Sequence, residues 1–164
     1  MIYCVEDDAG IRELVVYTLR NTGFEADGFE DGAALTAALK KCRPQLILLD
    51  IMMPDMNGYE VIERLKADER FCRIPVIFLS ALHDSENIVK GFKMGASDYV
   101  SKPFNHEELI TRVAHHMFIA EAQRVIVRQN EELQATLASR DKMYSVIAHD
   151  LRSPIGSLKM LFNT

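Results

Sequence analysis

Two short stretches of this chain are apolar at every position, and they limit the possible fold more than any other feature. They read Leu46-Ile47-Leu48-Leu49 and Pro75-Val76-Ile77-Phe78-Leu79. A strand with one face in water alternates apolar and polar residues, whereas a strand of a parallel sheet covered by helices is apolar throughout. The two stretches therefore predict strands that are buried on both faces of a parallel sheet.

Helical patterns alternate with these and three further strand candidates. The expected strands cover residues 2–5, 24–29, 46–49, 75–79 and 97–100. Apolar residues at helical spacing, together with turn residues such as Asn57-Gly58, place a helix after each strand. Five strand-then-helix units predict an α/β fold, with a doubly wound five-stranded parallel sheet and right-handed crossovers.

Composition narrows the class of protein. The 164 residues are 48% hydrophobic and 26% charged, with a formal net charge of −5, which is typical of a globular chain and argues against nucleic-acid binding. Cys4, Cys42 and Cys72 form no C-x-x-C pair, so neither a zinc site nor a redox motif is indicated. No apolar run approaches the roughly 18 residues of a membrane span. We expect a cytoplasmic protein, and we expect this chain to make no membrane contact.

Acidic residues stand where two of the expected strands end. Glu6, Asp7 and Asp8 follow the first strand, and Asp50 follows the third. The carboxyl ends of parallel strands share one edge of the sheet, so these carboxylates are expected to converge there. Mg²⁺ is the natural cation for such a site, and Mn²⁺ could take its place. Solvated acids that cap a loop are the alternative interpretation of the first three residues.

Two further polar residues are expected at the same edge. Ser80 ends the fourth strand, and Lys102 follows the fifth. A carboxylate nucleophile, a cation site, a hydroxyl group and an ammonium group together suit phosphoryl transfer to Asp50, which depends on positioning and on neutralising the phosphoryl oxygens. Each of the two would by itself more often be an ordinary residue at a strand end, so the combination carries the prediction.

Four motifs combine these residues with their neighbours, and they are Val5-Glu6-Asp7-Asp8, residues 48–58 (LLDIMMPDMNG), Leu79-Ser80-Ala81 and residues 95–104 (GASDYVSKPF). With these motifs, residues 1–118 resemble the receiver domains of response regulators. The resemblance implies a flavodoxin-like sheet of order 2-1-3-4-5 and a phosphohistidine protein as the phosphoryl donor to Asp50. It implies Mg²⁺ held by Asp7, Asp50 and the backbone carbonyl of Met52, with Glu6 as the second member of the acidic pair.

The same resemblance implies further details of the site. The Lys102–Pro103 bond is expected to be cis. Phosphate on Asp50 would draw Ser80 inward and let Tyr99 turn into the space behind it, which would bias the surface of the last two helices of the receiver. We also expect Met52 and Leu82 to restrict access of water to the phosphoryl group.

No glycine or proline lies between Pro103 and Pro154, which predicts one long helix. Its second half shows a heptad seam made of Ile126, Asn130, Leu133, Leu137, Arg140, Tyr144, Ile147 and Leu151. Such a seam is typical of a coiled coil, so we expect a homodimer through the helix of residues 105–158. A helix that folds back on its own domain is the alternative.

Residues 145–155 (SVIAHDLRSPI) resemble the phosphoacceptor box of sensor histidine kinases. His149 would be the acceptor, on the side of the helix opposite the seam, with Asp150 beside it and a bend in the helix near Pro154. The resemblance implies a hybrid histidine kinase, divided into a receiver (1–118), a coiled-coil helix (119–142) and the start of the phosphoacceptor helix (143–164). ATP would bind only in a kinase domain outside these residues.

Two other functions remain open on the sequence alone. A relay or adaptor module without kinase activity would use the heptads only for dimerisation. A transcription regulator with a DNA-binding output is disfavoured by the acidic balance. The remaining histidines, His83, His106, His115 and His116, have no motif around them and are expected at the surface.

Overall fold

The computed structural model describes residues 1–81 and 85–161, and it describes side chains as far as residue 152. Five parallel strands form one sheet in the order β2-β1-β3-β4-β5. The strands are β1 (Ile2–Val5), β2 (Ala26–Phe29), β3 (Leu46–Asp50), β4 (Val76–Ser80) and β5 (Asp98–Ser101). The predicted fold class and strand order are therefore confirmed.

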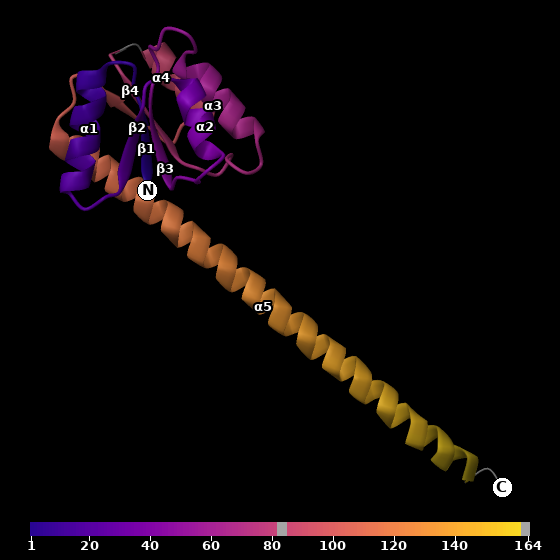
Figure 1. The fold of residues 1–164 in the computed structure, drawn as a ribbon. Coiled ribbons are helices and arrows are strands. Elements are labelled where there is room, and N and C mark those ends of the chain that lie inside the picture. Colours follow the sequence, from indigo (N-terminus) through magenta and orange to yellow (C-terminus); the bar gives the residue numbers. More distant parts are fainter. Residues whose placement is uncertain (82–84, 162–164) are drawn as a thin grey trace. The chain divides into compact units, whose positions relative to one another are not determined.

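Helices cover both faces of the sheet (Figure 1). They are α1 (Ala9–Asn21), α2 (Gly32–Leu39), α3 (Gly58–Ala67), α4 (Ser85–Lys93) and α5 (His106–Leu161). On one face, α1 and the beginning of α5 pack on the strands through Val15, Leu19, Leu109 and Val113. On the other face, α2 and α3 pack through Leu35, Leu39, Val61, Ile62 and Leu65.

The two fully apolar stretches lie at the centre of the sheet, as the sequence predicts. Every residue of β3 and β4 is buried. Asp50 and Ser80, the polar residues that end these strands, are buried with them. The buried strands thus carry a carboxylate and a hydroxyl group to one edge of the sheet.

Local side chains set where three helices begin. The carboxylates of Asp8 and Asp31 accept hydrogen bonds from the backbone N–H groups of Ile11 and Ala34, at 2.9 and 2.7 Å. The side-chain oxygen of Asn57 accepts a hydrogen bond from the backbone N–H of Glu60 at 3.0 Å. These caps satisfy backbone donors that a helix start leaves unpaired. Asp8 is therefore a helix cap, while Glu6 and Asp7 before it remain for the site.

The predicted long helix is also observed, since α5 continues from His106 to Leu161, through Pro154. The chain divides into two compact units, one of residues 1–121 and a second that starts at Ala122. In the second unit, all side chains of residues 126–152 are exposed, including the apolar seam. Within the described residues, no helix is both long enough and apolar enough to cross a membrane.

One expectation about the histidines was wrong. His116 is not a surface residue, because its Nε2 lies 2.9 Å from Oδ2 of Asp98 and its side chain is only 13% exposed. Asp98 also accepts hydrogen bonds from Arg112, at 3.0 and 3.2 Å, so the carboxylate ties β5 to α5. The pKa of Asp98 lies below its usual value because these bonds and the N–H of Tyr99 outweigh the effect of burial. His83 and Leu82 lie outside the described residues.

Candidate functional site

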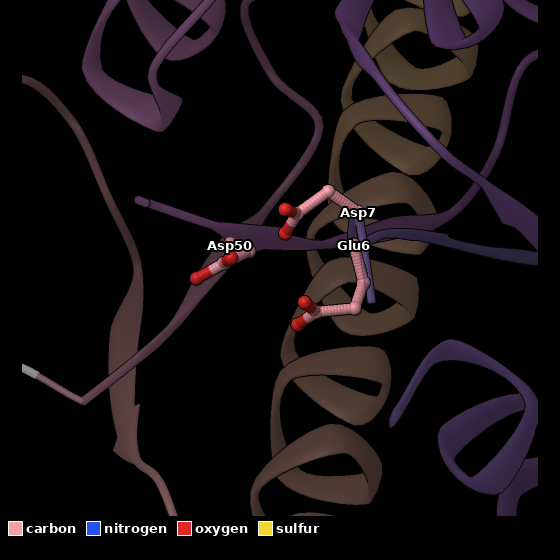
Figure 2. Close-up of side chains that lie close together, drawn as sticks. All are labelled: Glu6, Asp7 and Asp50. Carbon is pink, nitrogen blue, oxygen red and sulfur yellow. The ribbon is translucent and has the colours of Figure 1, made fainter. Parts of the chain in front are cut away.

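The carboxylates predicted to converge do so at the carboxyl ends of β1 and β3. Glu6, Asp7 and Asp50 each offer an oxygen atom within 4.8 Å of the other two, and no other group of this kind occurs among the described residues. Figure 2 shows the three side chains turned to the same side of the strand ends. Glu6 and Asp50 are 1% and 2% exposed, whereas Asp7 is exposed. The cluster therefore has a buried floor and one ligand at the surface.

Lys102 is the cation of this site. Its Nζ lies 2.5 Å from Oε2 of Glu6 and 3.2 Å from Oδ1 of Asp50. The Lys102–Pro103 bond is cis, as the resemblance implies. The backbone N–H of Lys102 donates to the carbonyl of Ser80 at 2.8 Å, which fixes the residue against the end of β4. Lys102 therefore lies at the acidic edge, where the sequence places it.

Burial and charge shift the pKa values of this pair. Burial raises the pKa of Glu6, the hydrogen bond from Lys102 opposes the rise, and the charge of Asp50 adds to it. Burial by itself would lower the pKa of Lys102, but the bond to Glu6 and the charge of Asp50 outweigh it, so this pKa is raised. The ammonium group therefore stays charged while it holds two buried carboxylates.

The residues present fit a divalent cation. Three carboxylates face one ammonium group, which leaves negative charge for a hard cation to balance, and carboxylate oxygens are the ligands that Mg²⁺ prefers. Met52 lies at this site as well, since its backbone N–H donates to Oδ1 of Asp50 at 3.3 Å. Its side chain is exposed.

Close packing fixes the end of β3. A Cβ atom on Gly58 would lie 2.5 Å from the backbone oxygen of Asp50 and 2.8 Å from Cα of Ile51, closer than real Cβ atoms come to backbone. The N–H of Gly58 donates to the carbonyl of Ile51 at 3.0 Å. Glycine is therefore required where α3 begins, and it lets the helix start pack directly against the residue that carries the central carboxylate.

Ser80 and Tyr99 meet behind the carboxylates. Ser80 is fully buried, one residue past Leu79, which is the partner of Asp50 in the β3–β4 pair. The hydroxyl of Tyr99 donates to the carbonyl of Ser80 at 3.3 Å, and the ring packs against the core. Tyr99 thus occupies an inward position in this structure.

His149 belongs to the second unit and is described separately. Its side chain is 87% exposed, and Nδ1 lies 3.4 Å from Oδ1 of Asp150. Because every side chain of residues 126–152 is exposed, those of the seam included, this exposure does not distinguish the predicted position opposite the seam, which stays a prediction. The helix continues past this histidine through Pro154.

Two contributors to the site were not predicted from the sequence. Nη1 of Arg12, in α1, donates to the backbone carbonyls of Glu6 and Asp7 at 2.6 and 3.2 Å. The sequence offered one usable signal, because a basic residue lies in the first turns of the helix that follows the acidic pair. The second contributor is Gly58, whose role depends on a close approach that no local pattern reveals.

The fold and this site define a receiver domain, and the comparisons agree. The family model of the response regulator receiver domain matches residues 2–114. The chain belongs to this family. The receiver role predicted from the sequence is thereby confirmed.

Known relatives carry the same domain in different proteins. The DNA-binding response regulator MtrA of Mycobacterium tuberculosis is 36% identical over 149 residues, which cover 90% of this chain and 60% of that protein. The chain thus spans about 60% of the length of these curated relatives. Chemotaxis protein CheY4 of Vibrio cholerae has 29% identity and a TM-score of 0.67, over 70% of this chain and 95% of that one.

A third similar structure comes from a different kind of protein. The signal receiver domain of a signal transduction histidine kinase from Syntrophus aciditrophicus has 32% identity and a TM-score of 0.66. The match covers 71% of this chain and 88% of that one. Receiver domains similar to this one therefore occur both in DNA-binding regulators and in histidine kinases.

Proposed function

We propose that Asp50 accepts a phosphoryl group from a phosphohistidine donor and that the receiver thereby regulates a histidine kinase whose acceptor is His149. The first half rests on one observation, the convergence of Glu6, Asp7 and Asp50 around the ammonium group of Lys102. A nucleophile, a cation site and a fixed positive charge are what phosphoryl transfer requires.

The chemistry assigned to the residues follows from their positions. Oδ1 of Asp50 is engaged by Lys102 and by the N–H of Met52, so Oδ2 is the oxygen that would form the new bond to phosphorus. The bond between phosphorus and the donor imidazole nitrogen breaks, and the imidazole leaves with the electron pair. Lys102 then neutralises a phosphoryl oxygen, and the Ser80 hydroxyl would donate to another.

A divalent cation, Mg²⁺ or Mn²⁺, would be held by Asp7 and Asp50, with Glu6 behind them and the Met52 carbonyl as a further ligand. When bound, it would neutralise charge on the phosphoryl oxygens. Before transfer, Lys102 ties the central carboxylate to Glu6, because its Nζ contacts both Oδ1 of Asp50 and Oε2 of Glu6. The restriction of water by Met52 stays a proposal; its support is that the backbone N–H of this residue bonds Oδ1 of Asp50.

The switch is proposed to pass through Ser80 and Tyr99. A phosphoryl group on Asp50 would draw the Ser80 hydroxyl toward it and hold Tyr99 in the inward position, which the ring already takes here with its hydroxyl on the Ser80 carbonyl. Because the amide of Tyr99 also bonds the Asp98 carboxylate, a change at the ring reaches the link between β5 and α5. The surface of α4, β5 and α5 would carry the signal.

The link to a kinase rests on the second unit. The motif of residues 145–155 and the exposure of His149 support a phosphoacceptor that another domain can reach. Asp150 would orient the imidazole. The Syntrophus structure is a precedent for a similar receiver in a histidine kinase. In this proposal residues 1–118 are the receiver, 119–142 the coiled-coil helix and 143–164 the beginning of the phosphoacceptor helix.

A homodimer through residues 105–158 is part of the same proposal. The apolar residues of the seam are exposed along α5, among them Ile126, Leu133, Leu137, Ile147 and Leu151. A helix that leaves such a stripe in water gains free energy when a second helix covers it. The three free cysteines fit the reducing cytoplasm that we assign to the protein.

A DNA-binding response regulator is the second candidate, and it is favoured by the description of MtrA. A DNA-binding regulator and a histidine kinase differ in the output region that follows the receiver. If the protein is a kinase, the motif around His149 becomes phosphorylated. If it is a DNA-binding regulator, this motif stays unmodified and the protein retards a DNA duplex. A dimeric relay module without kinase activity would do neither.

A phosphotransfer assay separates these outcomes. A protein that contains this chain is incubated with radiolabelled ATP and a histidine kinase catalytic domain, as wild type and with Asp50→Asn or His149→Gln. We expect acid-labile label that His149→Gln removes and base-labile label that Asp50→Asn removes. Asp55→Asn, an exposed acid nearby, is the matched control and should keep both labels. Base-labile label that persists in Asp50→Asn would refute the assignment of Asp50 as the phosphoryl acceptor.

A further inference from the structure

The exposed seam of α5 contains two polar positions that determine how a second copy can lie against it. In steps of four and three, the seam contains Ile126, Asn130, Leu133, Leu137, Arg140, Tyr144, Ile147 and Leu151. In heptad terms Asn130, Leu137, Tyr144 and Leu151 occupy the a positions, and the other four occupy the d positions. All eight side chains are exposed in the single chain.

Parallel and antiparallel pairings of this seam differ in what faces its polar residues. When two parallel copies are in register, Asn130 faces Asn130 and Arg140 faces Arg140, and all other layers contain no charged or amide side chain. When two antiparallel copies overlap fully, Asn130 faces Ile147 and Arg140 faces Leu137, each twice. A polar group buried against an apolar side chain without a partner is costly, so the parallel pairing is favoured.

The charges around Arg140 complement one another in the parallel pairing. A d residue inserts between four residues of the facing helix, here 137, 140, 141 and 144. Arg140 of one copy therefore meets Asp141 and Tyr144 of the other. Within one chain its Nη2 already lies 3.7 Å from Oδ1 of Asp141, and its Cζ lies 5.9 Å from the Tyr144 ring centre. Two arginines and two aspartates in one layer balance in charge.

We infer that a second copy of this chain pairs with α5 in parallel and in register along residues 126–151, and that the Arg140–Asp141 layer sets this orientation. The inference rests on the proposed dimer and specifies its geometry. His149 then lies on the outer side of both copies at the same level, because it is two positions from both Ile147 and Leu151 on the seam. Each phosphoacceptor would be reached from its own side of the pair.

Cysteine cross-linking of the whole chain tests the orientation, in a background with Cys42→Ser and Cys72→Ser. Leu137→Cys should form a disulfide with its own copy under mild oxidation, while Ala135→Cys, on the outer face, should not. A mixture of Ile126→Cys and Leu151→Cys proteins, which keep the Arg140–Asp141 layer, should give the 126–126 and 151–151 products and little 126–151 product. A dominant 126–151 product would overturn the parallel orientation and leave the dimer intact. A monomer in sedimentation at all concentrations would overturn both.

The polar layer has its own test. Arg140→Leu replaces it with an apolar layer, so the dimer dissociation constant should fall about tenfold or more, and out-of-register disulfides should appear. Asp141→Asn leaves two arginines facing each other without their counter-charges, so the dissociation constant should rise several-fold. Lys142→Gln, on the outer face, is the matched control. An unchanged dissociation constant in both Arg140→Leu and Asp141→Asn would contradict a role of this layer.

A second inference rests on separate contacts at the beginning of α1. Arg12 donates from Nη1 to the carbonyls of Glu6 and Asp7. Gly28 of β2 gives its side chain room, since a Cβ atom there would lie 2.8 Å from Cγ and 3.1 Å from Cδ of Arg12. We propose that Arg12 is a positioning residue that fixes the backbone of the acidic pair, and that Gly28 permits it.

The physical reason is preorganisation. Glu6 and Asp7 follow directly after β1, and their carboxylates must face Asp50 before a cation can bind. A guanidinium group that binds both carbonyls holds the two peptide units in one orientation, which lowers the entropy lost on binding. Arg12 would therefore change the affinity for the cation without contacting it.

A double-mutant cycle tests this role through the affinity for Mg²⁺, measured by titration calorimetry. Arg12→Ala and Gly28→Ala should each weaken Mg²⁺ binding about tenfold, the lower end of the loss typical of residues that orient metal ligands. The double variant should bind Mg²⁺ about as well as Arg12→Ala, because the two closest contacts of the added methyl group are with the Arg12 side chain, ahead of Cγ2 of Val16 at 3.2 Å. Arg12→Lys should recover part of the affinity.

Arg20→Ala is the matched control, because Arg20 lies on the same helix and binds Ala26 and Asp27 away from the site. The affinity of the Arg20→Ala variant for Mg²⁺ should equal that of the wild type. Additive losses in the double variant, or unchanged Mg²⁺ binding in Arg12→Ala, would overturn the proposal. Far-UV circular dichroism of each variant establishes that the fold is retained.

Discussion

Removing the ammonium group of Lys102 should make stability depend on pH in a defined direction. The group lies 2.5 Å from Glu6 and 3.2 Å from Asp50, both buried. At an effective dielectric constant of about 20, each attraction is on the order of 5–7 kcal/mol, and the cost of burying the ammonium group offsets much of it. Breaking a buried pair by removing one partner costs roughly 3–5 kcal/mol, which is the loss expected for Lys102→Met at pH 7.

The pH dependence follows from the carboxylates left behind. Burial already raises the pKa of Glu6, and without Lys102 the bond that opposes the rise is gone. A carboxyl group whose pKa is higher in the folded than in the unfolded state binds more protons when folded, so stability increases as pH falls. Between pH 7 and pH 5 the variant should therefore recover part of its loss, with a proton in place of the ammonium charge.

Urea unfolding followed by circular dichroism, in EDTA at both pH values, measures this effect. Lys41→Met, which removes an exposed lysine, is the control and should change the free energy of unfolding by less than about 0.5 kcal/mol. A loss below about 1 kcal/mol for Lys102→Met, or a loss equal at pH 7 and pH 5, would refute the argument that Lys102 neutralises buried charge.

Three further predictions concern single side chains. Gly58→Ala should lower the free energy of unfolding in urea by about 1–3 kcal/mol, because the new Cβ atom would displace the backbone at Asp50. No change in stability would contradict the close approach of α3 to the end of β3. Tyr99→Phe removes the hydroxyl that donates to the Ser80 carbonyl, so the free energy of unfolding, measured by the same method, should fall by about 0.5–1.5 kcal/mol. A variant more stable than the wild type would argue against the inward position of Tyr99. Asp98→Asn should lower the free energy of unfolding by about 1.5–3 kcal/mol between pH 5 and 8. Because the pKa of Asp98 is lowered in the folded state, the wild type loses this advantage as the carboxylate becomes protonated, so the difference between the two proteins should shrink below about pH 4. A difference that grows at low pH would contradict this explanation.

The sequence predicted most of the framework because its signals are local. Residues 46–49 and 75–79 are apolar at every position, so their burial followed from the local sequence alone. The residues at strand ends of a parallel sheet share an edge, which is why Asp50 and Lys102 could be expected together. One strand limit differs from the prediction, because β2 begins at Ala26 and not at Phe24, which packs against the core before the strand starts.

What the sequence missed depends on contacts between distant segments. His116 looked like a surface residue because nothing near it in the chain indicates Asp98, 18 positions earlier. The contacts of Arg12 with two carbonyls and the close approach of Gly58 to Asp50 are likewise set by packing. Asp8 shows the converse. The alternative interpretation of the acidic run was solvated acids that cap a loop, and this exposed residue caps α1 instead.

The most direct test is to locate the phosphoryl group after reaction with a small-molecule phosphodonor such as acetyl phosphate or phosphoramidate. Peptide mapping by mass spectrometry should find it on Asp50, with Mg²⁺ required and with Asp7→Asn or Lys102→Met strongly reducing the yield. Modification at another residue, or equal modification of Asp50 in EDTA, would contradict the claim that these carboxylates and Lys102 form a phosphoryl-accepting site.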